Sequence, residues 1–335
     1  MLLRLFSDIH LELSNNGLKL ANKILSAPVP DKTILILAGD IGNPNSKLYR
    51  NFITGVSQKY HQVLVITGNH EYYQKYQRKI SDHGIVHKYK PSIEEIDDMV
   101  RNIANSLPNV HFLQRSAFIY NRVRFLGCTL WTQSKPDLSK YMNDYQYISN
   151  MTPSLCESLH KADVEWLTSQ LNSTEKTDYD RRSCHEENLT EVPTQAELRS
   201  VRANAQACNP TELDSSRDFT KSQGYDRRSC HGSSLAGSQG YDYTVVITHH
   251  LPSYKLIDGK YADNPLNSFF ANHLDELVAK ADIWCCGHSH SSAQAIVGTC
   301  RCYLNPVGYS GESTGFNQNI LIPVSGNSFT IENSK

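Results

Sequence analysis

The chain has 335 residues, with 33 lysine and arginine residues against 34 aspartate and glutamate residues, a formal net charge of −1. This balance argues against strong long-range attraction to nucleic acid or to an anionic membrane, without excluding local basic patches. No run reaches the roughly 18 apolar residues of a membrane-spanning helix, and nine cysteines, an odd number, fit no disulfide framework, so we expect reduced thiols.

The chain begins with an apolar run, Leu2 to Phe6, that predicts a buried strand. It lacks the basic start and the longer apolar stretch of a secretory signal, so we expect a cytoplasmic protein. The run leads directly into Asp8 and His10. On an extended strand end these two side chains would point to the same side and could hold one metal ion. An Asp-x-His triplet alone often only caps a strand.

The next two apolar runs, Thr33 to Ala38 and Gln62 to Thr67, also end in polar motifs. Asp40 follows the first run in a Gly-Asp pair, which on its own indicates no more than a turn after a buried strand. The second run leads into Gly-Asn-His-Glu, where Asn69 could offer its carbonyl to a metal ion beside His70. Alternatively, Asn69 could cap a helix that starts after the strand.

The middle of the chain predicts helices and a hairpin. Helices are expected over Ser92 to Ser106 and Pro153 to Leu171, where apolar residues recur at helical spacing. Strands over Ser116 to Tyr120 and Val123 to Leu126 flank Asn121-Arg122, which is typical of a hairpin turn.

Residues 172–240 are polar and repetitive. The heptapeptide Tyr-Asp-Arg-Arg-Ser-Cys-His occurs at residues 179–185 and again at residues 225–231. Its Cys-His steps match no common zinc spacing, so duplication is the better interpretation. So polar a segment cannot bury enough surface to offset its ordering entropy. We expect a disordered, low-complexity insertion, dispensable for chemistry, within a single domain of residues 1–335.

Two further apolar runs, Tyr243 to Thr248 and Ala281 to Cys286, complete the predicted strands. His249 follows the first and is favoured as a metal ligand over the adjacent His250. His288 and His290 follow the second in Gly-His-Ser-His, and alternation would let each serve a different ion.

Together these strand ends offer two carboxylates, one amide and four imidazoles. This mixed oxygen and nitrogen set suits two divalent first-row metal ions, and Mn, Fe, Zn, Ni or Co would all be accepted. One Asp must bridge such a pair, and Asp40 is the natural candidate. The predicted ligands are Asp8, His10, Asp40, Asn69, His249, His288 and His290.

The motif series Asp-x-His, Gly-Asp, Gly-Asn-His-Glu, His and Gly-His-x-His resembles the calcineurin-like metallophosphoesterase superfamily, closest to small bacterial-type phosphoesterases of undefined substrate. Further similar stretches are Ser7 to Glu12, Gly127 to Trp131, Asn143 to Tyr145, Thr248 to Ser253 and Asn305 to Tyr309. The resemblance implies a four-layer α/β/β/α sandwich and hydrolysis of a phosphomonoester or phosphodiester by a metal-bridging hydroxide.

By the same resemblance, one ion would be held by Asp8, His10, Asp40 and His290, and the other by Asp40, Asn69, His249 and His288. His70 would assist the leaving group from outside the metal ligands. The arginines and the second aspartate of the related protein phosphatases are missing, and with them the usual carboxylate partner of His70. Val307 stands where a close relative is expected to have arginine.

The expected partner is therefore a small phosphate-ester substrate rather than a membrane. A nuclease with the same ligands is an alternative, disfavoured by the near-neutral charge. A non-catalytic binding scaffold on this fold is a second alternative, disfavoured because every ligand position and His70 hold competent residue types. The sequence does not indicate the oligomeric state.

Overall fold

The computed structural model describes residues 1–13, 17–80, 86–133, 135–173 and 240–325. Its first sheet has the strand order β13-β1-β2-β3-β6. Strands β1, β2, β3 and β6 are parallel, and only β13 at the edge runs antiparallel. The bounds are β1 (Leu2–Phe6), β2 (Thr33–Ala38), β3 (Gln62–Ile66), β6 (Val110–Phe112) and β13 (Ile322–Pro323).

The second sheet has the order β11-β12-β10-β9-β8-β7. Its four central strands are parallel, and the edge strands β7 and β11 are antiparallel to their neighbours. The bounds are β7 (Ser116–Tyr120), β8 (Val123–Cys128), β9 (Tyr243–Thr248), β10 (Ile283–Cys286), β11 (Ala293–Val297) and β12 (Cys300–Leu304).

The two sheets pack against each other through their inner faces. In the first sheet, Ile36 pairs with Leu5 on one side and with Leu64 on the other. All three belong to one buried apolar cluster with Phe125 and Val245 of the second sheet. Strands buried on both faces read as continuous apolar runs, which is why these runs were recognisable in the sequence.

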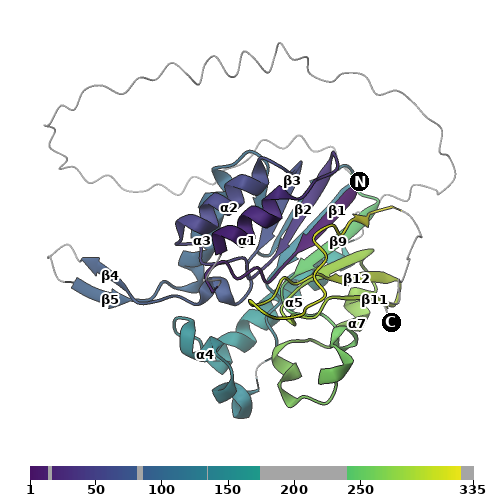
Figure 1. The fold of residues 1–335 in the computed structure, drawn as a ribbon. Helices are drawn as coiled ribbons and strands as arrows, with labels where there is room; N and C mark the ends of the chain where they lie inside the picture. The colour runs from purple at the N-terminus through teal and green to yellow at the C-terminus, as the bar shows by residue number, and fades with distance from the viewer. Residues whose placement is uncertain (14–16, 81–85, 134, 174–239, 326–335) are drawn as a thin grey trace, which may run out of the picture. The chain divides into compact units, whose positions relative to one another are not determined.

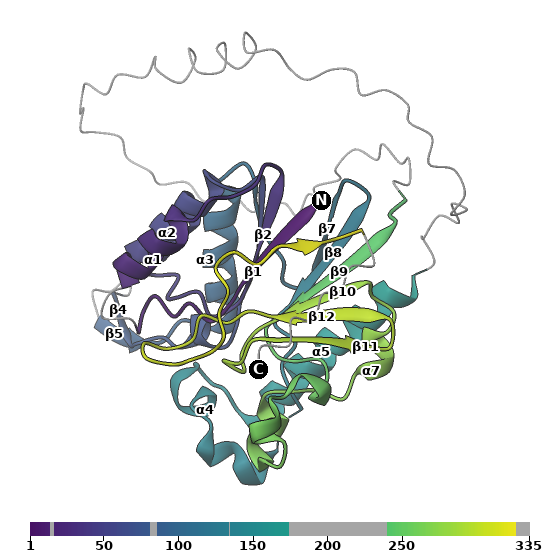
Figure 2. The ribbon, with the colours of Figure 1, turned by 45° about the vertical axis from the view of Figure 1, so that its right-hand side comes forward.

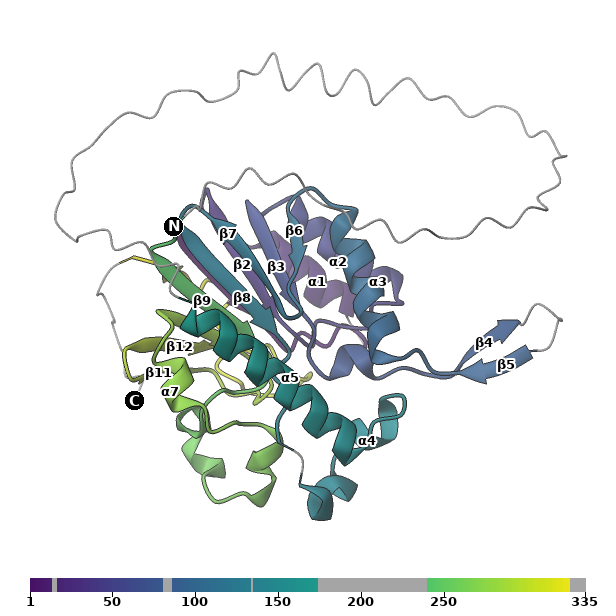
Figure 3. The same ribbon diagram turned by 180° about the vertical axis from the view of Figure 1, so that it is seen from behind.

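Helices cover the outer faces. α1 (Gly17–Ser26), α2 (Lys47–Ser57) and α3 (Ile93–Asn105) lie on the first sheet, whereas α5 (Pro153–Asn172) and α7 (Asp275–Val278) lie on the second (Figures 1 and 3). The turned view separates the helix, sheet, sheet and helix layers (Figure 2). The predicted four-layer α/β/β/α architecture is confirmed. Besides short 3₁₀ helices, the other described elements are a hairpin of β4 (Gln77–Ile80) and β5 (Val86–Tyr89), and the short α4 (Asp144–Tyr147).

Local sequence signals explain where the predicted helices begin. Ser92 Oγ accepts a hydrogen bond from Glu95 N at 3.2 Å, while the Glu95 carboxylate accepts from Ser92 N at 2.8 Å, a capping box at the start of α3. Thr152 caps α5, with Pro153 at its first position. The hairpin turn at Asn121 and Arg122 has positive φ at both residues, as a two-residue turn requires.

The predicted insertion, residues 172–240, lies outside the described residues except at its ends. Arg124 of β8 contacts residues at both ends of this segment. Its Nη2 donates to Gln170 O at 3.0 Å, Nη1 donates to Ser173 Oγ at 3.2 Å, and its guanidinium lies 4.1 Å from the ring centroid of Tyr241.

Two predictions from the composition concern membrane-spanning helices and cysteines. Within the described ranges, no helix combines the length and apolar character needed to cross a bilayer. The six cysteines of the described part are buried free thiols, five of them in strands and Cys156 in α5: Cys128, Cys156, Cys285, Cys286, Cys300 and Cys302.

Candidate metal centre

The predicted site residues come together at one edge of the two packed sheets. They sit in the segments that follow β1, β2 and β3 of the first sheet and β9 and β10 of the second. Because these strands are parallel within each sheet, their carboxyl ends meet at one edge. The residues so placed are Asp8, His10, Asp40, Asn69, His70, His249, His288 and His290.

One group of ligand-type atoms is formed by Asp8, His10 and His290, which lie within 4.8 Å of one another. His10 Nε2 and His290 Nε2 are 3.1 Å apart. His290 Nε2 is also 3.5 Å from Asp8 Oδ1. The group thus joins the segment after β1 to the segment after β10.

A second group contains Asp40, His249 and His288, again within 4.8 Å of one another. His249 Nε2 is 3.2 Å from His288 Nδ1 and 3.1 Å from Asn69 Oδ1. Asn69 therefore presents its carbonyl oxygen to this group. It does not cap the 3₁₀ helix His70–Tyr72 with its side chain, so the capping alternative is wrong.

Asp40 lies between the two groups. Its Oδ2 is 3.8 Å from His10 Nε2 in the first group and 3.3 Å from His249 Nε2 in the second. Its Oδ1 accepts a hydrogen bond from the backbone N of His70 at 2.8 Å, which fixes the orientation of the carboxylate. One oxygen is thereby directed at both groups.

The backbone at the site is not extended, as the sequence had predicted, but turns sharply. Strand alternation was expected to send Asp8 and His10, and likewise His288 and His290, to one side. Instead these four residues and Asp40 all have positive φ, from 49° at His290 to 71° at His288. The strands have already ended, and left-handed turns re-aim each side chain. Such conformations cost roughly 1–3 kcal/mol each and are held only where surrounding structure dictates them.

Two glycines let the backbone approach the groups closely. A Cβ on Gly39, whose φ is +84°, would lie 2.5 Å from His249 Nδ1. A Cβ on Gly68 would collide with Asp40 Oδ1 and lie 2.7 Å from His249 Nε2. Glycine is therefore required at both positions, by conformation at Gly39 and by space at Gly68.

Mutual electrostatic effects at the centre are strong. Burial alone would lower the pKa of His249, but the nearby Asp40 carboxylate outweighs it and raises the pKa to about 10. Burial would also lower the pKa of His290, but the nearby Asp8 carboxylate outweighs it and raises the pKa to about 9. Burial would raise the pKa of Asp40, yet His249 and the other imidazoles hold it well below its usual range. The raised pKa values of His249 and His290 show that the carboxylates of Asp40 and Asp8 concentrate negative charge here, which favours a bound cation.

His70 stands beside these groups with its two nitrogens in different surroundings. Nδ1 is 3.4 Å from Glu12 Oε1, and Nε2 is 3.3 Å from the hydroxyl of Tyr309. Glu12 thus supplies a carboxylate neighbour for His70, although the second aspartate of the related protein phosphatases is absent from this sequence. Burial lowers the pKa of His70, but Asp40 and Glu12 reverse this effect and raise it.

Glu12 Oε1 also lies 3.3 Å from Nδ1 of His10, so Glu12, His10 and His70 form a third close group. Here the carboxylate faces the Nδ1 side of His10, whereas Nε2 of His10 faces His290. Glu12 therefore serves as a hydrogen-bond acceptor that orients two rings.

Other carboxylates brace the centre. Glu71 Oε2 accepts hydrogen bonds from the backbone N of Asp40 and of Gly68, at 2.9 and 2.7 Å, which ties two of the turns together. Glu312 Oε2 accepts from His290 Nδ1 at 2.6 Å. Asp144 Oδ1 accepts from Asn69 Nδ2 at 2.8 Å and leaves the amide oxygen facing His249.

Sequence reasoning missed these supporting residues to different degrees. Glu12, Asp144 and Tyr309 lie in stretches that carried the family resemblance, but no role was assigned to them. Glu312 lies in a loop without any recognisable motif, and the sequence contained no signal for it. Val307, where arginine was expected, packs against a hydrophobic core cluster.

His250 does not join either group. Its Nδ1 lies 3.3 Å from the carbonyl oxygen of Thr129, and its ring centroid is 5.4 Å from that of Trp131. Burial and the adjacent His249 lower the pKa of His250 to about 3, so the ring is neutral. The geometry agrees with the preference for His249 over His250.

The residues present fit divalent metal ions. Imidazole nitrogens that face each other at 3.1 and 3.2 Å, next to buried carboxylates, gain a common partner when a cation lies between them. Gly39 and Gly68 leave the space beside His249 free of side chains. The donor set therefore supports divalent metal binding.

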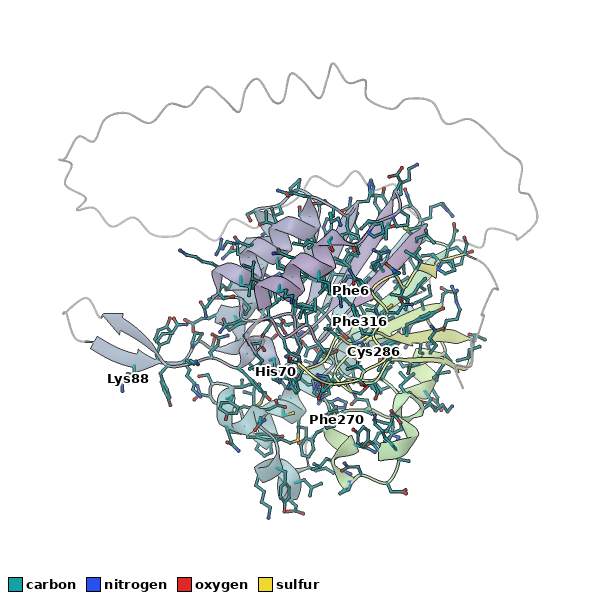
Figure 4. The ribbon with its side chains drawn as sticks, in the orientation of Figure 1. Phe6, His70, Lys88, Phe270, Cys286 and Phe316 are labelled. Carbon is teal, nitrogen blue, oxygen red and sulfur yellow. The ribbon has the colours of Figure 1, made fainter. Side chains whose placement is uncertain are left out.

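A cavity of about 400 Å³ opens beside the centre. Asp40, Asn69, His70, His288 and His290 form its inner wall, and residues of the segments after β3, β8, β9, β10 and β12 form the remainder. His70 and Phe270, both labelled in Figure 4, line this same cavity. A substrate could therefore reach the ligands and His70 from one side.

Comparison with known proteins supports this interpretation. Residues 1–154 match the family model described as calcineurin-like phosphoesterase. The chain is 24% identical over 340 residues, covering 96% of both sequences, to the uncharacterized protein L509 of Acanthamoeba polyphaga mimivirus.

The fold is also similar to a solved structure. The phosphopantetheinyl hydrolase PptH of Mycobacterium tuberculosis aligns with a TM-score of 0.54 at 13% identity, covering 92% of this chain and 89% of that chain. At this identity the likeness concerns the fold alone.

Proposed function

We propose that this chain, a calcineurin-like phosphoesterase by the match over residues 1–154, hydrolyses phosphoric esters with two divalent metal ions. The observation that carries the proposal is the position of Asp40 Oδ2, 3.8 Å from His10 Nε2 and 3.3 Å from His249 Nε2. A single carboxylate oxygen directed at two ligand groups is the arrangement that a bridging ligand requires.

In this proposal Asp40 belongs to both sites. The first ion would be held by Asp8, His10, Asp40 and His290, and the second by Asp40, Asn69, His249 and His288. Bound there, the ions would polarise a phosphate oxygen and lower the pKa of a water molecule.

The protein's own contribution is to position the substrate and to move a proton. The oxygen of water gives up one proton to the solvent and forms a bond to phosphorus while the ester bond to the leaving group breaks. Nε2 of His70, which lies 3.3 Å from the hydroxyl of the cavity-lining Tyr309, would donate a proton to the leaving oxygen, releasing an alcohol or a phenol. The Glu12 carboxylate beside Nδ1 orients the His70 ring and leaves Nε2 for the leaving group.

The alternative of a non-catalytic scaffold is less well supported. A decayed site would be expected to lack a ligand or the proton donor. Here each of the seven proposed ligands and His70 is of a competent residue type and lies at the same edge of the sheets.

A panel assay would test the proposal. The purified protein would be stripped of metal, reconstituted with Mn, Fe, Zn, Ni or Co, and offered phosphomonoesters, phosphodiesters, cyclic nucleotides and single-stranded DNA. We expect metal-dependent hydrolysis of a small ester, absent in the matched Asp40→Ala preparation. Hydrolysis confined to DNA would favour the nuclease alternative, and failure of every metal form on every ester would contradict the proposal.

A further inference from the structure

The cavity beside the metal centre has an aromatic lining that the proposed chemistry does not require. Five described tyrosines are among the most exposed large hydrophobic side chains, and three of them, Tyr141, Tyr261 and Tyr309, line this one cavity. Their exposed fractions are 61%, 46% and 39%. Solitary exposed aromatics are ordinary, but convergence on one hollow indicates a binding surface.

The inner part of the cavity is also aromatic. The Tyr73 ring stacks on His70, with centroids 4.2 Å apart at 30°. Its hydroxyl points away and donates to Asp144 at 2.5 Å, so the ring is held in place. The Phe270 ring lies 4.6 Å from that of His288. Flat apolar surfaces therefore lead from the rim to the proposed ligands.

The charges of the lining favour a substrate with little negative charge. None of the described residues that line the cavity is lysine or arginine, although Lys140 and Lys260 lie next to it, 5.0 and 4.9 Å from the ring centroids of Tyr141 and Tyr261. Its two carboxylates outside the proposed ligands are engaged with neighbours. Asp258 Oδ2 lies 3.1 Å from Lys260 Nζ, and Glu312 Oε2 accepts from His290. A phosphomonoester carries about two negative charges on three free oxygens, and the described lining includes no lysine or arginine that could pair with the third oxygen.

We infer that this cavity is a subsite for a planar aromatic arm of a monoanionic phosphodiester, with Tyr141 and Tyr261 as specificity-determining residues. A diester has one negative charge and two free oxygens, which two ions can hold without further cations. Its aromatic arm stacks between the two rim tyrosines, over the surface formed by Tyr73 and Phe270. The inference rests on the proposed function, since the phosphorus must lie at the metal centre.

Binding of two phosphinates would test the aromatic subsite without relying on turnover. Diphenylphosphinate and dimethylphosphinate have the same single charge and the same two oxygens, and neither has an ester bond to hydrolyse. They would be titrated calorimetrically into the metal-loaded protein. We expect diphenylphosphinate to bind at least roughly tenfold more tightly. Tyr141→Ala and Tyr261→Ala should each reduce that preference by a factor of about 2–10, while the phenylalanine variants retain it.

Tyr76→Ala is the matched control, because Tyr76 is 68% exposed and does not line the cavity. It should leave the preference unchanged. In parallel, phenyl 4-nitrophenyl phosphate should be hydrolysed with a higher kcat/KM than 4-nitrophenyl phosphate, which has the same leaving group and more charge.

The possible failures can be distinguished. Equal affinity for both phosphinates, or a preference that survives Tyr141→Ala and Tyr261→Ala, would overturn the subsite while the esterase activity stood. A higher kcat/KM for the monoester would overturn the inferred diester. If neither phosphinate binds and no ester is cleaved, the proposed function itself fails and the subsite with it.

Discussion

Glu12 Oε1 lies 3.4 Å from Nδ1 of His70 and 3.3 Å from Nδ1 of His10, so one carboxylate oxygen orients both the proposed proton donor and a proposed metal ligand. Glu12→Gln keeps the size of the side chain but removes its charge. We expect kcat to fall about 10–100-fold, because both rings lose their fixed orientation. Steady-state kinetics would measure the loss, and metal analysis should find the ions still bound. An unchanged kcat would show that Glu12 has no positioning role.

Asp40 and His70 should respond differently to truncation. Asp40→Ala removes the one carboxylate that faces both ligand groups, so metal content should fall at both sites and activity should be lost. His70→Ala should retain both ions and lower kcat by roughly 10²–10⁴-fold, the usual contribution of general acid catalysis. Elemental analysis combined with kinetics on both variants separates the roles. Full activity of Asp40→Ala would refute the bridging assignment.

Gly68→Ala should damage the centre through sterics alone. The added methyl group would collide with Asp40 Oδ1 and approach His249 Nε2 to 2.7 Å. We expect metal affinity to fall at least about tenfold, since the two ligands must move apart. Gly259→Ala is the matched control, because a Cβ there meets no atom within 4 Å. Equal metal affinity of the two variants, measured by competition with a chelator, would contradict the argument.

Asp97 makes stability depend on pH. Its side chain is 9% exposed and accepts a hydrogen bond from the Tyr72 hydroxyl at 2.6 Å. Burial raises the pKa of Asp97 to about 6, above its ordinary value of 3.8. The native state therefore holds this proton more tightly than the unfolded state. The resulting stabilisation is present below about pH 4 and is lost as pH rises through 6.

The asparagine of Asp97→Asn cannot ionise, so the variant does not lose this stabilisation as the pH rises. Between pH 4 and pH 7.5, the difference in unfolding free energy should shift in favour of the variant by roughly 2–3 kcal/mol. Urea unfolding at several pH values would measure it. Asp98→Asn, at a neighbouring exposed carboxylate, is the control. A difference between wild type and Asp97→Asn that does not vary with pH would count against the assignment.

The polar insertion should be dispensable. Arg124 holds the two ends together through Gln170 O, Ser173 Oγ and the ring of Tyr241. Replacing residues 178–238 with a short Gly-Ser linker keeps all of these contacts, and shortening a loop changes closure entropy only slowly. We expect kcat/KM within roughly threefold of the full chain. A deletion variant that folds, as judged by circular dichroism, but has lost activity would assign the insertion a role in the chemistry.

The sequence by itself determined seven of the described strands and the residue types that follow the five strands at the site, but not the order of the strands in the sheets. Apolar runs such as Thr33–Ala38 and Tyr243–Thr248 were recognisable because strands buried on both faces carry no alternation to obscure them. The shared edge of Asp8 and Asp40 also followed, since parallel strands of one sheet place their carboxyl ends together, whereas His249 follows a strand of the second sheet.

Only the tertiary structure decided how the side chains are aimed and supported. His10 and His290 are 280 positions apart, and their 3.1 Å approach depends on the packing of two sheets rather than on any local pattern. The positive φ angles at the proposed ligands are imposed by those long-range contacts and oppose local preference. Glu312 and the aromatic cavity belong to loops whose sequences carry no periodic signal, because loop conformation is set by the surfaces against which the loops pack.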